Sequence, residues 1–336
     1  MNITTNITQH LNLSFPLMMA PMYLVSNEEM MKAAIRNGIA GVFPAMNYDS
    51  NGLKNVIANL HSYKTNFQSG NYGVNIIVQK SNPVFEEQLA VCVGLKVPFF
   101  TTSLGNPSIV IEKAHSYGAK VYCDVTNLTH AKKCANAGCD GFIAVGQGAG
   151  GHAGPYTLQV LVPALIENFP EIPVVASGGI ANGTGILSML SLGASAISMG
   201  TRFIASHECK VSEEYKKAIL EAGMEDIVLS ERISGTPNSI INTPYAKKIG
   251  LKQNWIEKLI TKNPATKIYF KKILQKKNMT LLQKSILPGN YNNLWIAGQT
   301  AELINDIQFC DDIIQQLKQE TFEGFTQMVV KFFRQS

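Results

Sequence analysis

The stretch "PVVASGGIANGTGILSMLSLGASAISMGT", residues 173–201, contains one complete repeating unit of this chain. An apolar run, Pro173–Ser177, is followed by a Gly-Gly turn and by a helical pattern that ends at Gly193. A second apolar run, Ala196–Met199, then leads into another glycine turn. Short apolar runs bounded by turn residues are typical of buried strands, and a glycine commonly ends a helix in the left-handed conformation. The stretch therefore predicts a strand, a helix and a second strand.

The same unit recurs along the first two-thirds of the chain. Runs that are uninterrupted rather than alternating indicate parallel strands covered on both faces. Eight such units at regular spacing predict an α/β fold, a (β/α)8 TIM barrel, rather than an open doubly wound sheet, because eight is the number that closes a barrel. The eight predicted strands are Leu17–Ala20, Gly41–Pro44, Gly73–Ile77, Val97–Thr101, Lys120–Asp124, Gly141–Val145, Pro173–Ser177 and Ala196–Met199.

Residues 207–294 do not continue this repeat. They contain helical patterns, "SEEYKKAILEAG" and "NWIEKLITK", and the basic stretch "KIYFKKILQKKNMTLLQK" at 267–284. A strand-like run and a glycine turn return in "NNLWIAGQTAELI". We therefore expect a barrel formed by 1–206 and 295–336, with 207–294 as a helical cap inserted over the barrel mouth.

Composition limits the classes of protein to which the chain can belong. The 336 residues carry a formal net charge of +5, and no apolar run reaches the ~18 residues of a membrane span. No interleaved aromatic platform accompanies the basic stretch, so it indicates a solvated helix rather than a nucleic-acid site. The six cysteines form no C-x-x-C pair, which favours reduced thiols in a cytoplasmic protein. A homodimer is compatible with the sequence, which does not decide the oligomeric state.

The active site of a barrel lies at the carboxyl ends of its strands. Glycine turns follow the last two predicted strands, at Ser177-Gly178-Gly179 and Gly200-Thr201. Glycines let backbone N–H groups approach an anion, and this position is the usual phosphate pocket of the fold. The two turns therefore predict a phosphate-bearing ligand. No H-E-x-x-H motif or cluster of acids and histidines at strand ends indicates a metal site.

The loop "GQGAGGHAGP" after the sixth predicted strand has two interpretations. Gly146, Gly148 and Gly151 match the G-x-G-x-x-G pattern of a dinucleotide-binding turn. However, that pattern normally opens the first strand–helix unit, and Pro155 would obstruct a helix that starts inside it. The alternative is a loop built around His152, the one histidine at a predicted strand end, whose imidazole suits a general base at neutral pH.

Taken together, "MMAPM", "GVNI", "GAGGHAG", "VVASGGIANGTGI", "ISMGTRF" and "LWIAGQTAEL" resemble the nitronate monooxygenase (2-nitropropane dioxygenase) family, which is related to the flavin-dependent enoyl-acyl-carrier-protein reductase II. The resemblance covers residues 14 to 315 and implies FMN at the barrel mouth. It implies His152 as the catalytic base and a flavin-covering loop at the glycines. The residues expected to bind the cofactor are Ala20, Pro21, Met22, Asn75, Asp124, Gly146, Gln147, Gly151, Ser177, Gly178, Gly179, Gly200, Thr201 and Gln299.

Two positions depart from the family pattern. Many members have an acid where this chain has Gly148, and some have a lysine near the position of Asp124. The leading expectation is FMN-dependent oxidation of nitronates or nitroalkanes by O2 to a carbonyl compound and nitrite. The alternatives are NAD(P)H-dependent reduction of an enoyl thioester and a non-catalytic flavin sensor.

Overall fold

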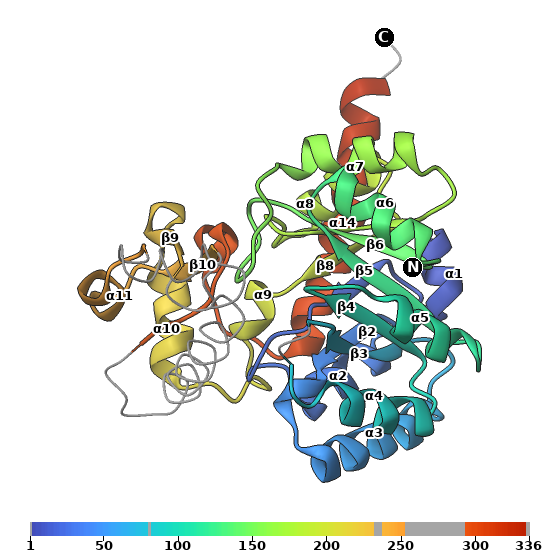
Figure 1. The fold of residues 1–336 in the computed structure, drawn as a ribbon. Helices are drawn as coiled ribbons and strands as arrows, with labels where there is room; N and C mark the ends of the chain where they lie inside the picture. The colour runs from blue at the N-terminus through green and yellow to red at the C-terminus, as the bar shows by residue number, and fades with distance from the viewer. Residues whose placement is uncertain (1, 80–81, 232–236, 253–292, 334–336) are drawn as a thin grey trace.

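The computed structural model describes residues 2–79, 82–231, 237–252 and 293–333 (Figure 1). Its centre is a closed barrel of parallel strands in sequence order, in which β1 pairs with both β2 and β8. The predicted (β/α)8 TIM barrel is confirmed. The strands are β1 Leu17–Met19, β2 Ala40–Pro44, β3 Asn71–Ile77, β4 Phe99–Ser103, β5 Lys120–Val125, β6 Gly141–Val145, β7 Val174–Ser177 and β8 Ala196–Met199.

Helices alternate with these strands and cover the outside of the barrel (Figure 1). The first of them begins at Glu28, because the Asn27 side chain accepts the N–H groups of Glu29 and Met30. Glycine ends others, as at Gly118, whose φ is +85°. The helices are α2 Glu28–Arg36, η1 Ala45–Asn47, α3 Ser50–Lys64, α4 Phe85–Gly94, α5 Ser108–His115, α6 Leu128–Asn136, α7 Leu158–Asn168, α8 Gly183–Ser191 and α9 Thr201–Ile204.

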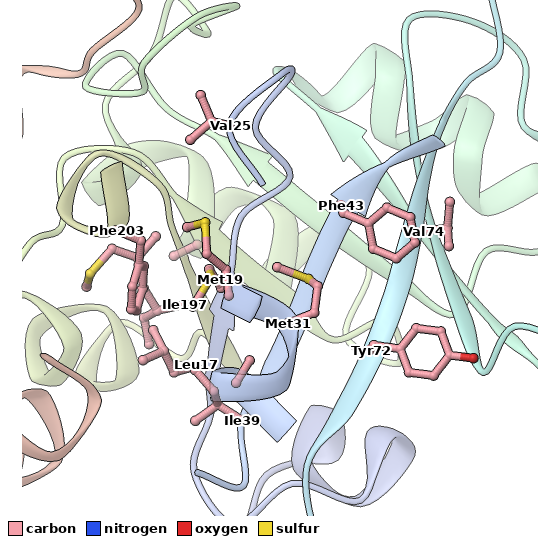
Figure 2. Close-up of a cluster of buried hydrophobic side chains, with 14 of the residues drawn as sticks. Leu17, Met19, Val25, Met31, Ile39, Phe43, Tyr72, Val74, Ile197 and Phe203 are labelled. Carbon is pink, nitrogen blue, oxygen red and sulfur yellow. The ribbon is translucent and has the colours of Figure 1, made fainter. Parts of the chain in front are cut away.

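Two apolar layers hold the barrel together. Outward-facing strand residues pack against the helices, and Figure 2 shows part of this layer, with Met31 of α2 among side chains from β1, β2, β3 and β8. Inward-facing residues, among them Met18, Phe99 and Tyr122, form a separate interior cluster. Helix α1 (Asn6–Leu11) adds Ile7 and Leu11 to that cluster. The interior is therefore packed, and a ligand meets the barrel at the carboxyl ends of the strands.

Residues beyond β8 form a smaller unit beside the barrel mouth (Figure 1). The helix predicted from "SEEYKKAILEAG" is present, whereas the antiparallel pair β9–β10 was not predicted. The "NWIEKLITK" segment and the basic stretch at 267–284 lie outside the described residues. The elements are α10 Glu213–Glu221, η2 Met224–Asp226, β9 Ile227–Ser230, β10 Asn238–Ile241, α11 Pro244–Ile249 and η3 Gln299–Leu303.

The long helix α14 (Cys310–Phe333) returns the chain to the barrel (Figure 1). Asp311, in its first turn, accepts two hydrogen bonds from the Arg36 guanidinium, at 2.6 and 2.7 Å. Further along the helix, Glu320 accepts the Gly183 N–H at 2.7 Å. These contacts attach α14 to α2 and α8. Among the described helices, none is long and apolar enough to span a lipid bilayer.

Packing inside the barrel leads to a first prediction, on stability. A Cβ added to Gly73 would lie 2.5 Å from Cζ of the Phe99 ring, which is fully buried. We expect Gly73→Ala to lower the free energy of unfolding by about 1–3 kcal/mol through overpacking. Gly94→Ala is the control, because a Cβ there meets no atom within 4 Å. Urea unfolding of both variants measures the difference, and equal stability would contradict this account.

Candidate active site

A cavity opens at the carboxyl ends of β1, β6, β7 and β8. It measures about 530 Å³, counting the open space at its mouth. The predicted site residues that line it are Ala20, Pro21, Met22, Ser177, Gly178, Gly179, Gly200 and Thr201.

The two glycine turns form the floor of this cavity. Gly178 and Gly179 have φ angles of +108° and +74°, which side-chain-bearing residues rarely adopt. A Cβ on Gly200 would lie 3.6 Å from the Met22 sulfur, on the cavity side of the turn. Hydroxyl groups of Ser177, Ser198, Thr201 and Thr300 occur around the lining, and none of the lining residues is charged. The lining thus offers neutral donors and room for close approach, which suits an anionic group such as phosphate.

The glycine loop after β6 forms a wall of the cavity and is packed tightly against neighbouring backbone. The Gly148 carbonyl accepts the Gly179 N–H at 3.1 Å. A Cβ on Gly148 would lie 2.8 Å from Cα of Gly179, and one on Gly150 would lie 2.9 Å from N of Gly298. The loop therefore has no space at position 148 for an acidic side chain.

The dinucleotide-fingerprint interpretation of this loop is wrong. The loop does not open a helix, because α7 begins only at Leu158. Instead it folds back on itself, with the Gly154 N–H donating to the Gly146 carbonyl at 3.2 Å. The Gln147 N–H likewise donates to the Tyr156 carbonyl at 2.8 Å. The glycines allow the loop backbone to pack closely over the barrel mouth.

His152 lies on the same loop, two residues after Gly150, which lines the cavity. Gly151, which precedes it, exchanges two backbone hydrogen bonds with Ser239 of β10, at 2.7 and 3.2 Å. This pairing ties the loop to the smaller unit. The His152 imidazole is exposed and is not part of the cavity lining. Gly146, Gln147 and Gly151 belong to the same loop and are also outside the lining.

Asn75 and Asp124 lie on another side of the barrel mouth and are joined through Ser103. The Asn75 amide donates to Oγ1 of Thr101 at 3.0 Å and to Oγ of Ser103 at 2.9 Å. The Ser103 hydroxyl then donates to a carboxylate oxygen of Asp124 at 2.6 Å. Sequence reasoning named Asn75 and Asp124 but missed Thr101 and Ser103, which connect them.

The segment after residue 293 completes the cavity from outside the barrel repeat. Ile296 and Thr300 line it, whereas the predicted Gln299 is exposed at the start of η3. The Gly298 N–H donates to Oγ1 of Thr201 at 3.0 Å and so attaches this segment to the start of α9. The lining residues that were not among the expected cofactor-binding residues also include Gly148, Ala149, Gly150, Ile180, Ser198, Met199 and Ile204.

Comparisons with known proteins point to one family. The family model described as nitronate monooxygenase matches residues 43–320. A probable nitronate monooxygenase of Staphylococcus saprophyticus is 26% identical over 90% of this chain and 94% of its own. A (3aS,4S,5R,7aS)-5-hydroxy-7a-methyl-1-oxo-octahydro-1H-indene-4-carboxyl-CoA dehydrogenase of Rhodococcus jostii is 25% identical over 93% of this chain and 94% of its own.

Among solved structures, FabK from Thermotoga maritima is similar over nearly the whole molecule. The match covers 98% of this chain and 100% of that one, with a TM-score of 0.84 and 29% sequence identity. The family match, the barrel and the cavity at its carboxyl end lead to one assignment. The chain belongs to the nitronate monooxygenase family and is a flavin-dependent oxidoreductase.

Proposed function

We propose that the flavin is FMN and that it binds across the barrel mouth. The glycine turns after β7 and β8 supply a cradle for one phosphate group, which a Cβ at Gly179 or Gly200 would narrow. Asn75 and Asp124 supply polar groups for the other end of the molecule. Apart from the tightly packed glycine loop after β6, the described residues of the lining include no second glycine turn for the phosphate of an adenosine half, which favours FMN over FAD.

The reaction that we propose is the oxidation of nitronates or nitroalkanes by O2 to a carbonyl compound and nitrite. Bound flavin supplies the electron transfer between substrate and oxygen. In this proposal His152 removes the acidic proton of a neutral nitroalkane, and the glycine loop covers the reacting groups. The observation that carries the proposal is the attachment of the His152 loop to Ser239 on one side and to Gly179 on the other. This attachment fixes the loop that carries His152, and part of the same loop lines the cavity.

Reduction of an enoyl thioester by NAD(P)H is the second candidate. It is favoured by the likeness to FabK, an enoyl-acyl-carrier-protein reductase II, and by a relative named as a CoA-thioester dehydrogenase. Both candidates require the same flavin site. They differ in the compound that reduces the flavin and in the compound that reoxidises it.

Anaerobic mixing distinguishes the two candidates and makes a second prediction. We expect a nitronate to bleach the flavin absorbance and O2 to restore it with release of nitrite. NADH and NADPH should bleach it slowly by comparison. Rapid bleaching by NADH or NADPH, followed by reoxidation with crotonyl thioester but not with O2, would reverse the assignment. Mass spectrometry of the released cofactor tests FMN separately, since FAD would contradict the phosphate cradle.

We further propose that the enzyme works in the cytoplasm on small molecules. All six cysteines are buried and free of disulfides. Buried, reduced thiols fit a reducing compartment.

A further inference from the structure

Polar side chains form a layer inside the barrel, directly above its apolar interior. Phe99, Tyr122 and Val175 belong to the interior cluster. Residues two positions further along the same strands point to the same side, because side chains alternate along a strand. This alternation brings Thr101, Asp124 and Ser177 into one layer, and Ser177 also lines the cavity. The layer therefore connects Asp124 with the proposed flavin site.

Asp124 is the acidic member of this layer. Its neighbours on β5, Cys123 and Val125, belong to the outer apolar layer, so its carboxyl group faces the barrel interior. The side chain is half-buried, at the carboxyl end of β5. The hydrogen bond from Ser103 fixes one carboxylate oxygen, and Asn75 in turn holds Ser103.

The surroundings of Asp124 disfavour its negative charge. Its neighbour across the β5–β6 pair is Ile143, which is apolar. Burial raises the pKa of the Asp124 carboxyl to about 6, while the Ser103 hydrogen bond acts in the opposite direction. No charged side chain of the described residues contributes to this shift. At neutral pH the Asp124 carboxyl group is therefore ionised, but a modest further rise in its pKa would protonate it.

We propose that Asp124 is a proton-binding residue of the active site, which takes up one proton from solvent when a small oxyanion, such as a nitronate or a carboxylate, enters the barrel mouth. This inference rests on the proposed function, because it assumes that substrates bind over the flavin at that mouth. An ionised carboxylate would repel the anion, whereas a protonated one can donate a hydrogen bond to it. The proton is bound and released with the ligand, so no bond to carbon changes.

The proposal predicts a specific pH dependence of anion binding. Nitrate is the probe, because it is planar and its charge is constant over the whole range. When only the protonated form binds the anion, the apparent affinity falls with the fraction of that form. Between pH 6.5 and 8.5 the dissociation constant of the flavin-loaded protein should therefore rise about tenfold per pH unit. The dissociation constant is measured from the change in flavin absorbance as nitrate is added.

Three variants separate Asp124 from other titrating groups. Asp124→Asn should remove the pH dependence and bind nitrate at pH 8.5 as tightly as the wild type does at low pH. In Ser103→Ala, the affinity for nitrate should begin to fall at a higher pH than in the wild type, because the hydrogen bond that stabilises the ionised carboxylate is lost. Asp140→Asn should behave as the wild type, because Asp140 hydrogen-bonds the Val121 N–H and pairs with Lys120 and His115, away from the cavity lining. If Asp124→Asn keeps the wild-type pH dependence, another group such as His152 is responsible and the proposal fails.

Infrared spectroscopy tests the same proton without relying on catalysis or on the flavin. The difference between wild type and Asp124→Asn isolates the carbonyl stretching band of the protonated Asp124 carboxyl. Its titration midpoint should lie well above the usual value of an aspartate, which is about 3.9. Saturating nitrate should raise the midpoint further. If nitrate leaves the midpoint unchanged, the proposal for Asp124 fails. If nitrate raises the midpoint but the enzyme does not turn over nitronates, only the proposed reaction fails.

Discussion

Replacing His152 with alanine should slow the oxidation of neutral nitroalkanes by roughly 10²–10⁴-fold, the usual contribution of a positioned general base. A preformed nitronate has already lost its proton, so its oxidation should fall much less. FMN should remain bound, because the His152 side chain is outside the cavity lining. Steady-state rates on both substrate forms, with the flavin content of each preparation, measure the effect.

The matched control for this variant is His130→Ala. His130 is also exposed and lies near the start of α6, after the carboxyl end of β5, where its ring contacts the Thr126 hydroxyl at 3.0 Å. The His130→Ala variant should oxidise nitroalkanes and nitronates at the wild-type rates. An equal loss on nitroalkane and nitronate in His152→Ala would show that His152 positions the substrate or supports the loop, and its role as a base would be wrong.

The strands of the barrel could be predicted because each is a short apolar run buried on both faces. The sixth and eighth were predicted at the observed bounds, and β4 shows why others shift. The predicted Val97–Thr101 begins too early, since the strand begins at Phe99, just after Pro98, which has no N–H for a ladder. It also ends too early, because Thr102 and Ser103 look like loop residues. In the structure their hydroxyls bond Cys123 and Asp124 on the next strand.

The site was predictable only where the barrel repeat itself forms it. The turns after β7 and β8 follow from strand order, because the carboxyl ends of parallel strands meet at one end of a barrel. Ile296 and Thr300 reach the cavity through pairing with β10 and through Thr201, about 100 positions earlier in the chain. No local periodicity encodes such contacts. The pair β9–β10 was missed for a similar reason, since each strand has only four residues and its partner lies outside the barrel repeat.

Replacing Gly179 with leucine should weaken FMN binding by at least about 100-fold. A Cβ at Gly179 finds no atom closer than 3.9 Å, so the space beside it is open and the side chain would extend toward the cavity that Gly179 lines. There it would occupy the proposed phosphate position. Losing two hydrogen bonds to a charged group at ~1.5 kcal/mol each amounts to ~3 kcal/mol, which is about 100-fold in affinity. Quenching of FMN fluorescence on titration with apoprotein measures the affinity.

Backbone strain must be separated from loss of the phosphate site, because Gly179 has a φ of +74°. Gly118→Leu is the matched control. Gly118 has a φ of +85°, nothing lies within 4 Å of an added Cβ, and the residue follows α5, remote in sequence from the cavity lining. Both leucine variants should lose a similar ~1–2 kcal/mol of stability from the left-handed backbone, but only Gly179→Leu should lose FMN. If Gly179→Leu folds and still binds FMN as tightly as Gly118→Leu does, the phosphate lies elsewhere and the turns after β7 and β8 are structural.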